Sequence, residues 1–376
     1  MATGRTTRSP SLPGIAPRFR TAPRRASVIG AGSFGTAVAV LLERAGLRTT
    51  LLCRTAEQAE QLSADGENKR YLPGVELPDR LKIRVLGGVE DQFRRSDLIF
   101  VAVPSKGLSE ALAELRRQGV APRAGVVSLA KGLVPPDGTP PTVALEELFG
   151  PDRVACIGGP AHALEMVEQG AGLVCASHAP ALAEQIAETF RAAGVVCEAS
   201  SDPVGVELAG VAKNAAALAA AASEAQGRNA AGMAAADIFN EVLALAKQRG
   251  ARSRTFVGRA GVGDLVATAL APSSRNRSAG ELLGQGVPAS EIPERVGQAV
   301  EALETVPLLS RAIQAAGLDG PIVSALAQLI DGSLPLEQWV QRVRVSQPEP
   351  ARGSRFTAWW NRWRARFRSR RRPPSG

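Results

Sequence analysis

The pattern of hydrophobic and polar positions predicts a chain with two unlike halves. Between residues 26 and 200, short apolar runs alternate with segments of helical periodicity such as 34–45 and 179–193. Most of these runs are uninterrupted, which is typical of strands that helices cover on both faces. We therefore expect an α/β fold built on a parallel sheet. The predicted strands are 26–29, 48–53, 97–103, 125–129, 154–157, 172–175 and 195–198.

The second half is predicted to be entirely helical. After about residue 202 the strand pattern stops, and helical patterns punctuated by Gly and Pro continue to about residue 346. The Ala-rich stretch 211–222 is interrupted by Lys213 and Asn214, and no run of 18 uninterrupted apolar residues occurs, so a buried helix fits better than a membrane span. We predict a dinucleotide-binding domain at 26–200 and a helical substrate domain at 201–346.

Charge is concentrated at the two ends of the chain. The 376 residues contain 45 Lys and Arg against 36 Asp and Glu, a net charge of +9. Residues 1–25 hold six Arg and residues 351–376 hold nine, with no acid in either, so the remaining 30 bases and 36 acids give the body a charge of about −6. A nucleic-acid-binding body is not expected, because the electrostatic footprint would have to lie in the folded part.

The four cysteines and two histidines also exclude two kinds of structure. The cysteines lie far apart without Cys-x-x-Cys spacing. Neither a disulfide framework nor a metal site is expected from so few ligands at such spacing.

Both basic ends are predicted to be appendages. Residues 1–25 contain four prolines, which favours a disordered extension over the amphipathic helix of a transit peptide. In the tail 347–376, a helix would place five aromatic residues on one face, flanked by Arg, which predicts contact of 355–372 with an anionic membrane. A solvated tail and an RNA-binding or partner-binding segment are the alternatives. The aromatic residues are Phe356, Trp359, Trp360, Trp363 and Phe367.

The strongest local motif is a glycine-rich turn after the first predicted strand. Its sequence is Gly30-Ala31-Gly32-Ser33-Phe34-Gly35, and it opens a helix. Glycines are needed there for a tight turn, for close approach of the backbone to a pyrophosphate and for packing of helix on strand, while the helix N-terminus attracts the anion. The motif predicts a Rossmann-like dinucleotide-binding domain.

The second predicted strand bears on the choice of cofactor. An acid at its end would bind both ribose hydroxyls of NAD, but Cys53-Arg54 stands there. Because an Arg can pair with a 2′-phosphate, NADP is favoured over NAD. Alternatively, Arg54 stacks on the adenine and either cofactor is accepted.

Two of the six lysines stand out in a chain with 39 arginines. Lys131 follows a predicted strand, at the edge where ligands bind in open α/β sheets, although a solvated surface position is the alternative. Lys213 lies among apolar residues, and a partly buried Lys can shift its pKa and donate a proton. Asp264 and Thr268 are four residues apart and would share a helix face, so Asp264 is a candidate counter-ion for a buried Lys.

A third polar cluster is the stretch Ser274-Arg275-Asn276-Arg277. A planar guanidinium beside an amide is well suited to hold a phosphate or a carboxylate. Arg277 alternatively is a surface charge with no further role.

Taken in order, these motifs resemble those of the bacterial NAD(P)-dependent glycerol-3-phosphate dehydrogenases over about residues 26–335. The Lys-Asn and Ser-Arg-Asn elements are specific to that family. The matching stretches are 30–37, Asn68 with 71–74, 103–105, Lys131-Gly132, Gly159-Pro160, Lys213-Asn214, 263–265 and 274–276.

The resemblance implies NAD(P)H-dependent reduction of dihydroxyacetone phosphate to sn-glycerol 3-phosphate, which supplies phospholipid biosynthesis. It implies that Lys213 protonates the developing alkoxide, that Asp264 sets the charge and position of Lys213, and that Lys131 assists. It further implies a cytoplasmic homodimer. The tail is not part of the resemblance, and its own residue pattern predicts that it holds the enzyme at the inner membrane surface. The implied substrate-binding residues are Asn214, Thr268, Arg275, Asn276, Gly159 and Ser274. The implied cofactor-binding residues are Gly30, Gly32, Ser33, Phe34, Gly35, Arg54, Lys131, Ala163 and Arg275.

The chain departs from the family pattern in two places. Gly159-Pro160 is followed by Ala161-His162 where the family usually has Ser or Thr and then Phe, and 236–239 replaces a Thr-Arg-Gly-Leu-like stretch. His162 is either a substitute polar contact or a loop residue with no further role. The alternative functions are a related reductase of a small keto acid, a 3-hydroxyacyl-type dehydrogenase and a catalytically idle cofactor-binding paralogue.

Overall fold

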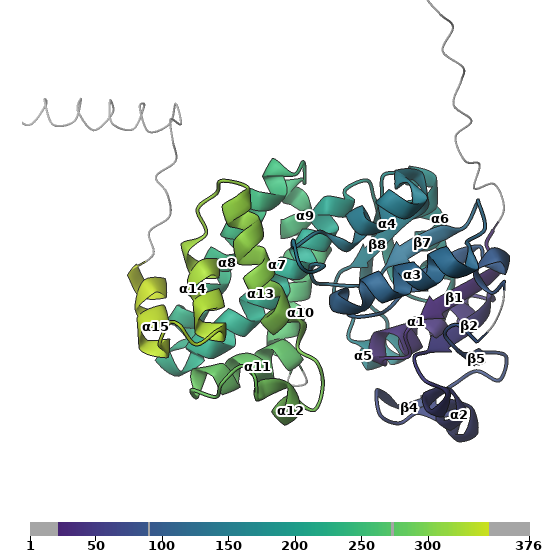
Figure 1. Ribbon diagram of the computed structural model, residues 1–376, viewed down its shortest axis with the longest axis horizontal. Coiled ribbons are helices and arrows are strands. Elements are labelled where there is room, and N and C mark those ends of the chain that lie inside the picture. The colour runs from purple at the N-terminus through teal and green to yellow at the C-terminus, as the bar shows by residue number, and fades with distance from the viewer. Residues whose placement is uncertain (1–21, 89–90, 272–273, 346–376) are drawn as a thin grey trace, which may run out of the picture.

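A sheet domain and a bundle of helices lie side by side (Figure 1). The computed structural model describes residues 22–88, 91–271 and 274–345. The predictions for the N-terminal extension and for the tail 347–376 therefore fall largely or wholly outside the described residues. The α/β sheet half followed by an all-helical half is the architecture that the hydrophobic pattern predicts.

The sheet half is built on eight strands in the order β10-β9-β8-β7-β6-β1-β2-β5. All seven predicted strands are present. The eighth, β5, is an edge strand whose charged and apolar residues alternate, so it lacks the apolar run of a buried strand. The strands are β1 Arg25–Ile29, β2 Arg48–Cys53, β5 Lys82–Val85, β6 Leu98–Val101, β7 Gly125–Ser128, β8 Val154–Gly158, β9 Gly172–Ser177 and β10 Val196–Ser200, with a separate hairpin of β3 Glu67–Asn68 and β4 Leu72–Glu76.

The sheet is parallel, as predicted, except at one pair of strands. Strand β9 runs antiparallel to β8, and β10 is parallel to β9. The connection from β8 to β9 holds only the six-residue helix α5, Ala163–Glu168. A parallel crossover needs a segment that returns along the full length of the strand, usually a longer helix. With only α5 in the connection, β9 instead runs back beside β8 in the opposite direction.

Helices cover both faces of the sheet. One face packs under α1 (Ser33–Arg44) and α6 (Pro180–Ala192), and the other under α3 (Leu108–Gln118) and α4 (Pro141–Phe149). Alternate residues of a strand serve opposite faces, as Phe100 and Val101 do. The helix α2, Ala56–Asp65, follows β2.

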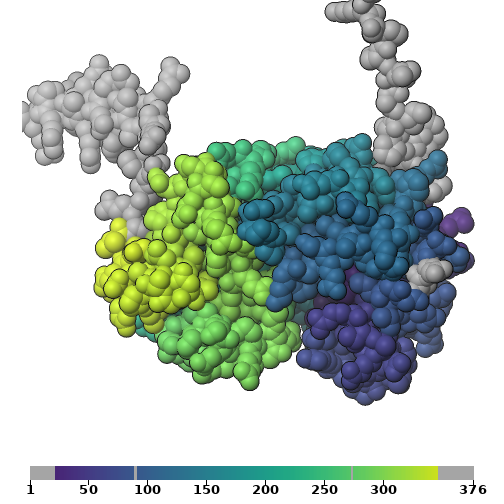
Figure 2. Space-filling view, viewed as in Figure 1, coloured from purple at the N-terminus to yellow at the C-terminus, as the bar shows by residue number. Residues whose placement is uncertain are grey.

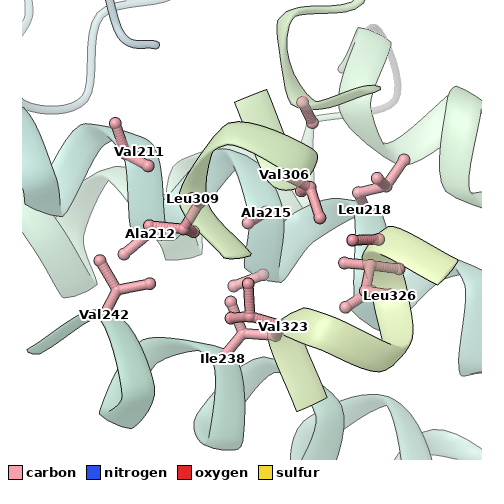
Figure 3. Close-up of a cluster of buried hydrophobic side chains, with 14 of the residues drawn as sticks. Val211, Ala212, Ala215, Leu218, Ile238, Val242, Val306, Leu309, Val323 and Leu326 are labelled. Carbon is pink, nitrogen blue, oxygen red and sulfur yellow. The ribbon is translucent and has the colours of Figure 1, made fainter. Parts of the chain in front are cut away.

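The second half surrounds the central helix α7, Pro203–Ser223 (Figure 3). Apolar side chains of α7, α8, α13 and α14 meet in one buried cluster, which includes Ala215, Ile238, Leu309 and Val323. The other helices of this half are α8 Arg228–Gln248, α9 Ser253–Val257, α10 Asp264–Leu270, α11 Arg275–Gly284, α12 Ile292–Val296, α13 Glu301–Ala315, α14 Pro321–Ile330 and α15 Leu336–Val345.

Helix α7 also joins the two halves. It begins at Asp202, whose side chain accepts a hydrogen bond from the Gly205 backbone N–H at 2.9 Å, and it packs against Cys156 of β8 and Val174 of β9. The segment Pro203–Gln226 is long and apolar enough to span a membrane, but 89% of its most apolar stretch is buried, as the predicted core helix requires. The predicted domain boundary near residue 200 stays a prediction, because α7 contacts both halves.

Candidate functional site

The glycine-rich turn lies between β1 and α1 and has the geometry of a cradle. Gly30 has a φ of +108°, and a Cβ there would lie 2.6 Å from the Ala102 carbonyl oxygen. A Cβ on Gly35 would lie 2.0 Å from the Gly30 carbonyl oxygen, whereas one on Gly32 would meet open space. No side chain caps the N-terminus of α1, which begins at Ser33 and Phe34. The turn therefore fits the pyrophosphate of a dinucleotide, with free backbone N–H groups facing outward.

Two amide side chains fix this turn from the opposite side. Asn68 donates to the Ala31 carbonyl at 3.1 Å and to the Thr36 hydroxyl at 2.7 Å. Gln58 donates to the same Ala31 carbonyl at 3.2 Å. Asn68 is buried at the loop end of the β3–β4 hairpin, where it pairs with Leu72, so the hairpin holds the glycine-rich turn in place. The sequence motif contained Asn68, but its spacing gave no sign of this contact.

Arg54 lies at the carboxyl end of β2, before the Thr55 cap of α2. Its side chain is exposed and makes no hydrogen bond or ion pair within the described part of the chain. This leaves the guanidinium free to contact a group attached to the adenosine ribose.

The central feature of the site is one carboxylate shared by two lysines. Lys131 Nζ lies 2.8 Å from Asp264 Oδ2, and Lys213 Nζ lies 3.3 Å from Asp264 Oδ1. The three side chains are only 16%, 10% and 3% exposed, for Lys131, Lys213 and Asp264 respectively. Lys131 is therefore not a solvated surface residue. Figure 2 shows the surface hollowed between the purple and blue half and the green half, which contribute these residues.

Thr268 completes the contacts around Lys213. It lies one turn after Asp264 on α10, as predicted, and its hydroxyl accepts a hydrogen bond from Lys213 Nζ at 3.0 Å. It also lies 3.4 Å from Asp264 Oδ1. Thr268 and Asp264 thus fix the ammonium group of Lys213 from two directions.

Burial and charge set the protonation of this cluster. Burial is the main cause that lowers the pKa of Lys213 to about 8, and the Lys131 charge adds to it, while Asp264 opposes both. Burial alone would raise the pKa of Asp264, but the charges of Lys131 and Lys213 outweigh it, so that its pKa lies below the usual range. Lys213 is therefore a cation at neutral pH that can release its proton readily.

A chain of amides leads from this cluster to α11. Asn214 Nδ2 donates to the Lys131 carbonyl at 3.0 Å, and Asn276 Nδ2 donates to Asn214 Oδ1 at 2.7 Å. The Asn276 Oδ1 atom is buried and has no hydrogen-bond partner among the residues that the structure describes. An unpaired buried acceptor is costly, so it is suited to receive a hydroxyl of a bound ligand.

Gly159 supports the first lysine. Its carbonyl accepts a hydrogen bond from Lys131 Nζ at 3.1 Å. Its φ is +102°, and a Cβ would lie 2.3 Å from the Gly172 carbonyl oxygen, so no other residue fits there without displacement. Strand β8 thus ends in a turn whose carbonyl points at the site.

The Ser-Arg-Asn stretch lies at the N-terminus of α11. The buried Ser274 caps the helix by accepting from the Arg277 backbone N–H at 3.3 Å. Arg275 is exposed and donates to the Ala299 carbonyl at 3.2 Å. Arg277 is more than an isolated surface charge: it contacts the Ala269 carbonyl at 2.9 Å, Glu281 and Glu224, and thereby ties α11 to α10.

The departure at Ala161-His162 lies beside the same site. His162 precedes α5, and its Nε2 atom is 3.4 Å from the Ala267 carbonyl of α10. Ala163 is the first residue of α5 and is half-buried. The imidazole thus makes a contact between the two halves, next to Thr268.

Glu301 is a site residue that the sequence did not indicate. It lies at the start of α13, and its carboxylate interacts with the charges of Arg275, Lys213 and Lys131 and with the Ser105 backbone N–H. Burial raises its pKa despite those cations. Glu301 and Ser105 line a cavity of about 250 Å³. In the sequence, an acid in the first turn of a helix is unremarkable, because it suits the helix dipole.

Comparison with known proteins identifies the family. Sequence models of the NAD-dependent glycerol-3-phosphate dehydrogenase N-terminus and C-terminus match residues 25–183 and 202–341. A glycerol-3-phosphate dehydrogenase (NAD(P)+) of Deinococcus radiodurans is 40% identical over 314 residues, which is 81% of this chain and 90% of the relative. One of Chlorobium luteolum is 35% identical over 335 residues, 87% of this chain and 99% of the relative.

A solved structure agrees with these matches. The crystal structure of glycerol-3-phosphate dehydrogenase from Coxiella burnetii superposes with a TM-score of 0.79 at 27% identity, covering 86% of this chain and 99% of that one. The family matches cover both halves of the described chain, including every residue of the lysine–aspartate cluster. The chain belongs to the NAD-dependent glycerol-3-phosphate dehydrogenase family.

Proposed function

We propose that this chain is an NAD(P)-dependent glycerol-3-phosphate dehydrogenase that reduces dihydroxyacetone phosphate to sn-glycerol 3-phosphate in a reversible reaction. The observation that carries the proposal is the buried Lys213–Asp264–Lys131 cluster, in which one carboxylate contacts two lysines from different halves of the chain. The product is the backbone of phospholipids, so the enzyme supplies phospholipid biosynthesis.

In this proposal the residues of the chain bind, orient and protonate the ketone. A reduced nicotinamide cofactor, held at the glycine-rich turn from Gly30 to Gly35, would supply the hydride for C2. Lys213 Nζ donates a proton to the C2 oxygen as negative charge develops there, which yields the alcohol and a neutral lysine. Asp264 keeps Lys213 charged before the reaction, and Lys131 places a second cation beside the developing oxyanion.

The phosphate of the substrate is held away from the reacting carbon. Arg275 and Asn276 lie at the N-terminus of α11, where a guanidinium, an amide and the helix dipole all favour an anion. Asn214 and Thr268 then orient the carbonyl and hydroxyl groups. Binding energy from the phosphate is thereby used to align C2 for hydride transfer.

Cofactor preference is proposed to follow from Arg54. A free guanidinium at the end of β2 favours the 2′-phosphate of NADP, and no acid stands there to bind both ribose hydroxyls. Arg54→Ser should weaken NADPH binding by about tenfold and leave NADH binding within about twofold, measured by fluorescence titration. Equal loss for both cofactors would instead support stacking on the adenine.

The assay for the proposed reaction is oxidation of NADPH or NADH with dihydroxyacetone phosphate, run beside ketopantoate and a 3-ketoacyl substrate. We expect turnover with dihydroxyacetone phosphate alone and sn-glycerol 3-phosphate as the product. Preference for a keto acid would favour the related reductases. Cofactor binding without turnover on any substrate would favour an idle paralogue.

Assembly and location are proposed on weaker ground. We propose a cytoplasmic homodimer whose residues 355–372, outside the described part of the chain, contact an anionic membrane surface through their Arg and aromatic residues. Sedimentation with phosphatidylglycerol vesicles should recover more full-length protein than protein ending at Ser346. Equal recovery would contradict the membrane contact, and light scattering tests the dimer.

A further inference from the structure

A second concave site lies on the dinucleotide-binding half, at the opposite edge of the sheet from the glycine-rich turn. A cavity of about 880 Å³ opens where β1, β2 and β5 begin. Arg25 opens β1 and Arg48 opens β2, and the two are register partners across the sheet. Because β2 is six residues long, the cavity lies roughly 20 Å from Arg54 at the other end of that strand.

The cavity is lined by an excess of cations. Among the residues that the structure describes, its lining contains six basic side chains and two acidic ones. The basic residues are Arg25, Arg48, Arg80, Lys82, Arg84 and Arg95, and the acidic residues are Glu43 and Asp79.

Most of these cations have no partner in the protein. The side chains of Arg25, Arg48, Lys82 and Arg95 are exposed and make no hydrogen bond or ion pair with any residue between 22 and 345 that the structure describes. Four unpaired cations around one cavity repel one another, and a bound anion would relieve that repulsion.

The acids nearby do not neutralise this charge. Glu43 is 4% exposed, and its carboxylate accepts a hydrogen bond from the Thr49 backbone N–H at 2.6 Å. Arg80 Nε lies 3.8 Å from the same carboxylate. The charge of Glu43 is therefore largely taken up by its contacts with Thr49 and Arg80. Asp97, just outside the lining, accepts from the backbone N–H groups of Arg24 and Arg25. Asp79 is the other acid among the described lining residues, so these two acids offset only part of the charge of six bases.

We propose that this cavity binds a small soluble ligand that carries several phosphate groups. Guanidinium groups match phosphate in a bidentate geometry, and five of the six cations are Arg. The volume lies within the range of small-ligand sites. The ligand is distinct from the cofactor and the substrate, because neither the glycine-rich turn nor the lysine–aspartate cluster lines this cavity.

The lining disfavours larger anionic partners. The lining residues that the structure describes include no aromatic side chain on which a base of single-stranded nucleic acid could stack. None of the exposed large apolar residues of the described chain belongs to it, so it lacks the means to insert into a lipid surface. The chain's own basic end, residues 1–21, carries no acid and would be repelled.

The test is isothermal titration calorimetry of the full chain with inorganic tripolyphosphate as the probe. The protein is first saturated with NADP+ and dihydroxyacetone phosphate, an oxidised cofactor with a ketone, so that the proposed cofactor and substrate sites are both filled and no turnover occurs. We expect one tripolyphosphate per chain, bound more weakly as salt is raised.

Two double variants decide whether the cavity is the site. Arg48→Ser with Lys82→Ser should weaken tripolyphosphate binding at least tenfold and leave the kcat for dihydroxyacetone phosphate unchanged. The matched control, Arg254→Ser with Lys247→Ser, removes the same charges from exposed positions on α9 and α8 and should change binding less than twofold. The single variant Arg95→Ser should weaken binding about threefold, which guards against misfolding of the double variant.

Three results would overturn the proposal: absence of tripolyphosphate binding to the saturated protein, equal loss in both double variants, or unchanged affinity in Arg48→Ser with Lys82→Ser. Binding of phosphatidylglycerol vesicles or of single-stranded RNA through Arg48 and Lys82 without binding of tripolyphosphate would also contradict it. Because binding is measured apart from turnover, failure here leaves the proposed dehydrogenase activity intact.

Discussion

Asp264→Asn tests the electrostatic basis of the proposed proton donor. The substitution keeps the shape of the side chain and removes the charge 3.3 Å from Lys213 Nζ. With an effective dielectric constant of about 20, two unit charges at that distance interact by about 4 to 5 kcal/mol. Loss of this interaction lowers the pKa of Lys213 by roughly three pH units. The wild-type pKa is about 8, so the protonated fraction at pH 7 falls from about nine-tenths to about one in a hundred.

The assay is the rate of NADPH oxidation with saturating dihydroxyacetone phosphate between pH 5 and 9. We expect kcat of Asp264→Asn at pH 7 to fall about 100-fold and to recover partly as the pH is lowered. Thr268→Val is the matched control, because it removes a neutral contact to Lys213 and leaves the charge. This variant should lower kcat about tenfold or less, and its kcat should still fall with rising pH near pH 8. An Asp264→Asn variant that folds, as judged by its melting curve, and keeps kcat within threefold would refute the reasoning.

Three further predictions concern other parts of the site. In the wild type, reduction needs protonated Lys213, so the kcat for reduction should fall as pH rises through about 8. The kcat for oxidation of sn-glycerol 3-phosphate should rise over the same pH range. Parallel pH profiles for the two directions would be inconsistent with this role. Arg275→Lys should raise the KM for dihydroxyacetone phosphate about tenfold with little change in kcat, because a bidentate clamp is lost; a change confined to kcat would place Arg275 elsewhere. Gly159→Ala should lower the free energy of unfolding, measured by chemical denaturation, by about 1 to 3 kcal/mol more than the control Gly170→Ala does. Both glycines have a positive φ, but only at Gly159 would a Cβ lie 2.3 Å from a carbonyl oxygen. Equal losses in the two variants would contradict this clash.

Local patterns predict most of the fold. The strands came from uninterrupted apolar runs such as 154–157, and the glycine motif at Gly30 located the first turn. The reversal of β9 was not predictable in this way, because the direction of a strand depends on the length of its connection and leaves no mark on its own residues. Strand β5 was not predicted, because an edge strand need not be apolar throughout.

The candidate site was predicted where unusual residues stood in apolar surroundings. Lys213 and Asp264 are buried polar residues of α7 and α10, and such residues need partners. Glu301 and Asn68 were missed as functional residues because their local context is ordinary, and only tertiary contacts reveal their roles. Arg277 had an ordinary local context too, and its contacts with Ala269 and Glu281 follow from the packing of α11 beside α10.

The most direct test of the central claim compares the wild type with Lys213→Ala in single-turnover reduction of dihydroxyacetone phosphate by bound NADPH. The account predicts that Lys213→Ala binds NADPH with an affinity within about threefold of the wild type, since Lys213 contacts Asp264 and Thr268 and lies outside the glycine-rich turn. It also predicts that hydride transfer slows by at least 1,000-fold, roughly the contribution of a general acid. Transfer at a rate within tenfold of the wild type, with sn-glycerol 3-phosphate as the product, would contradict the account.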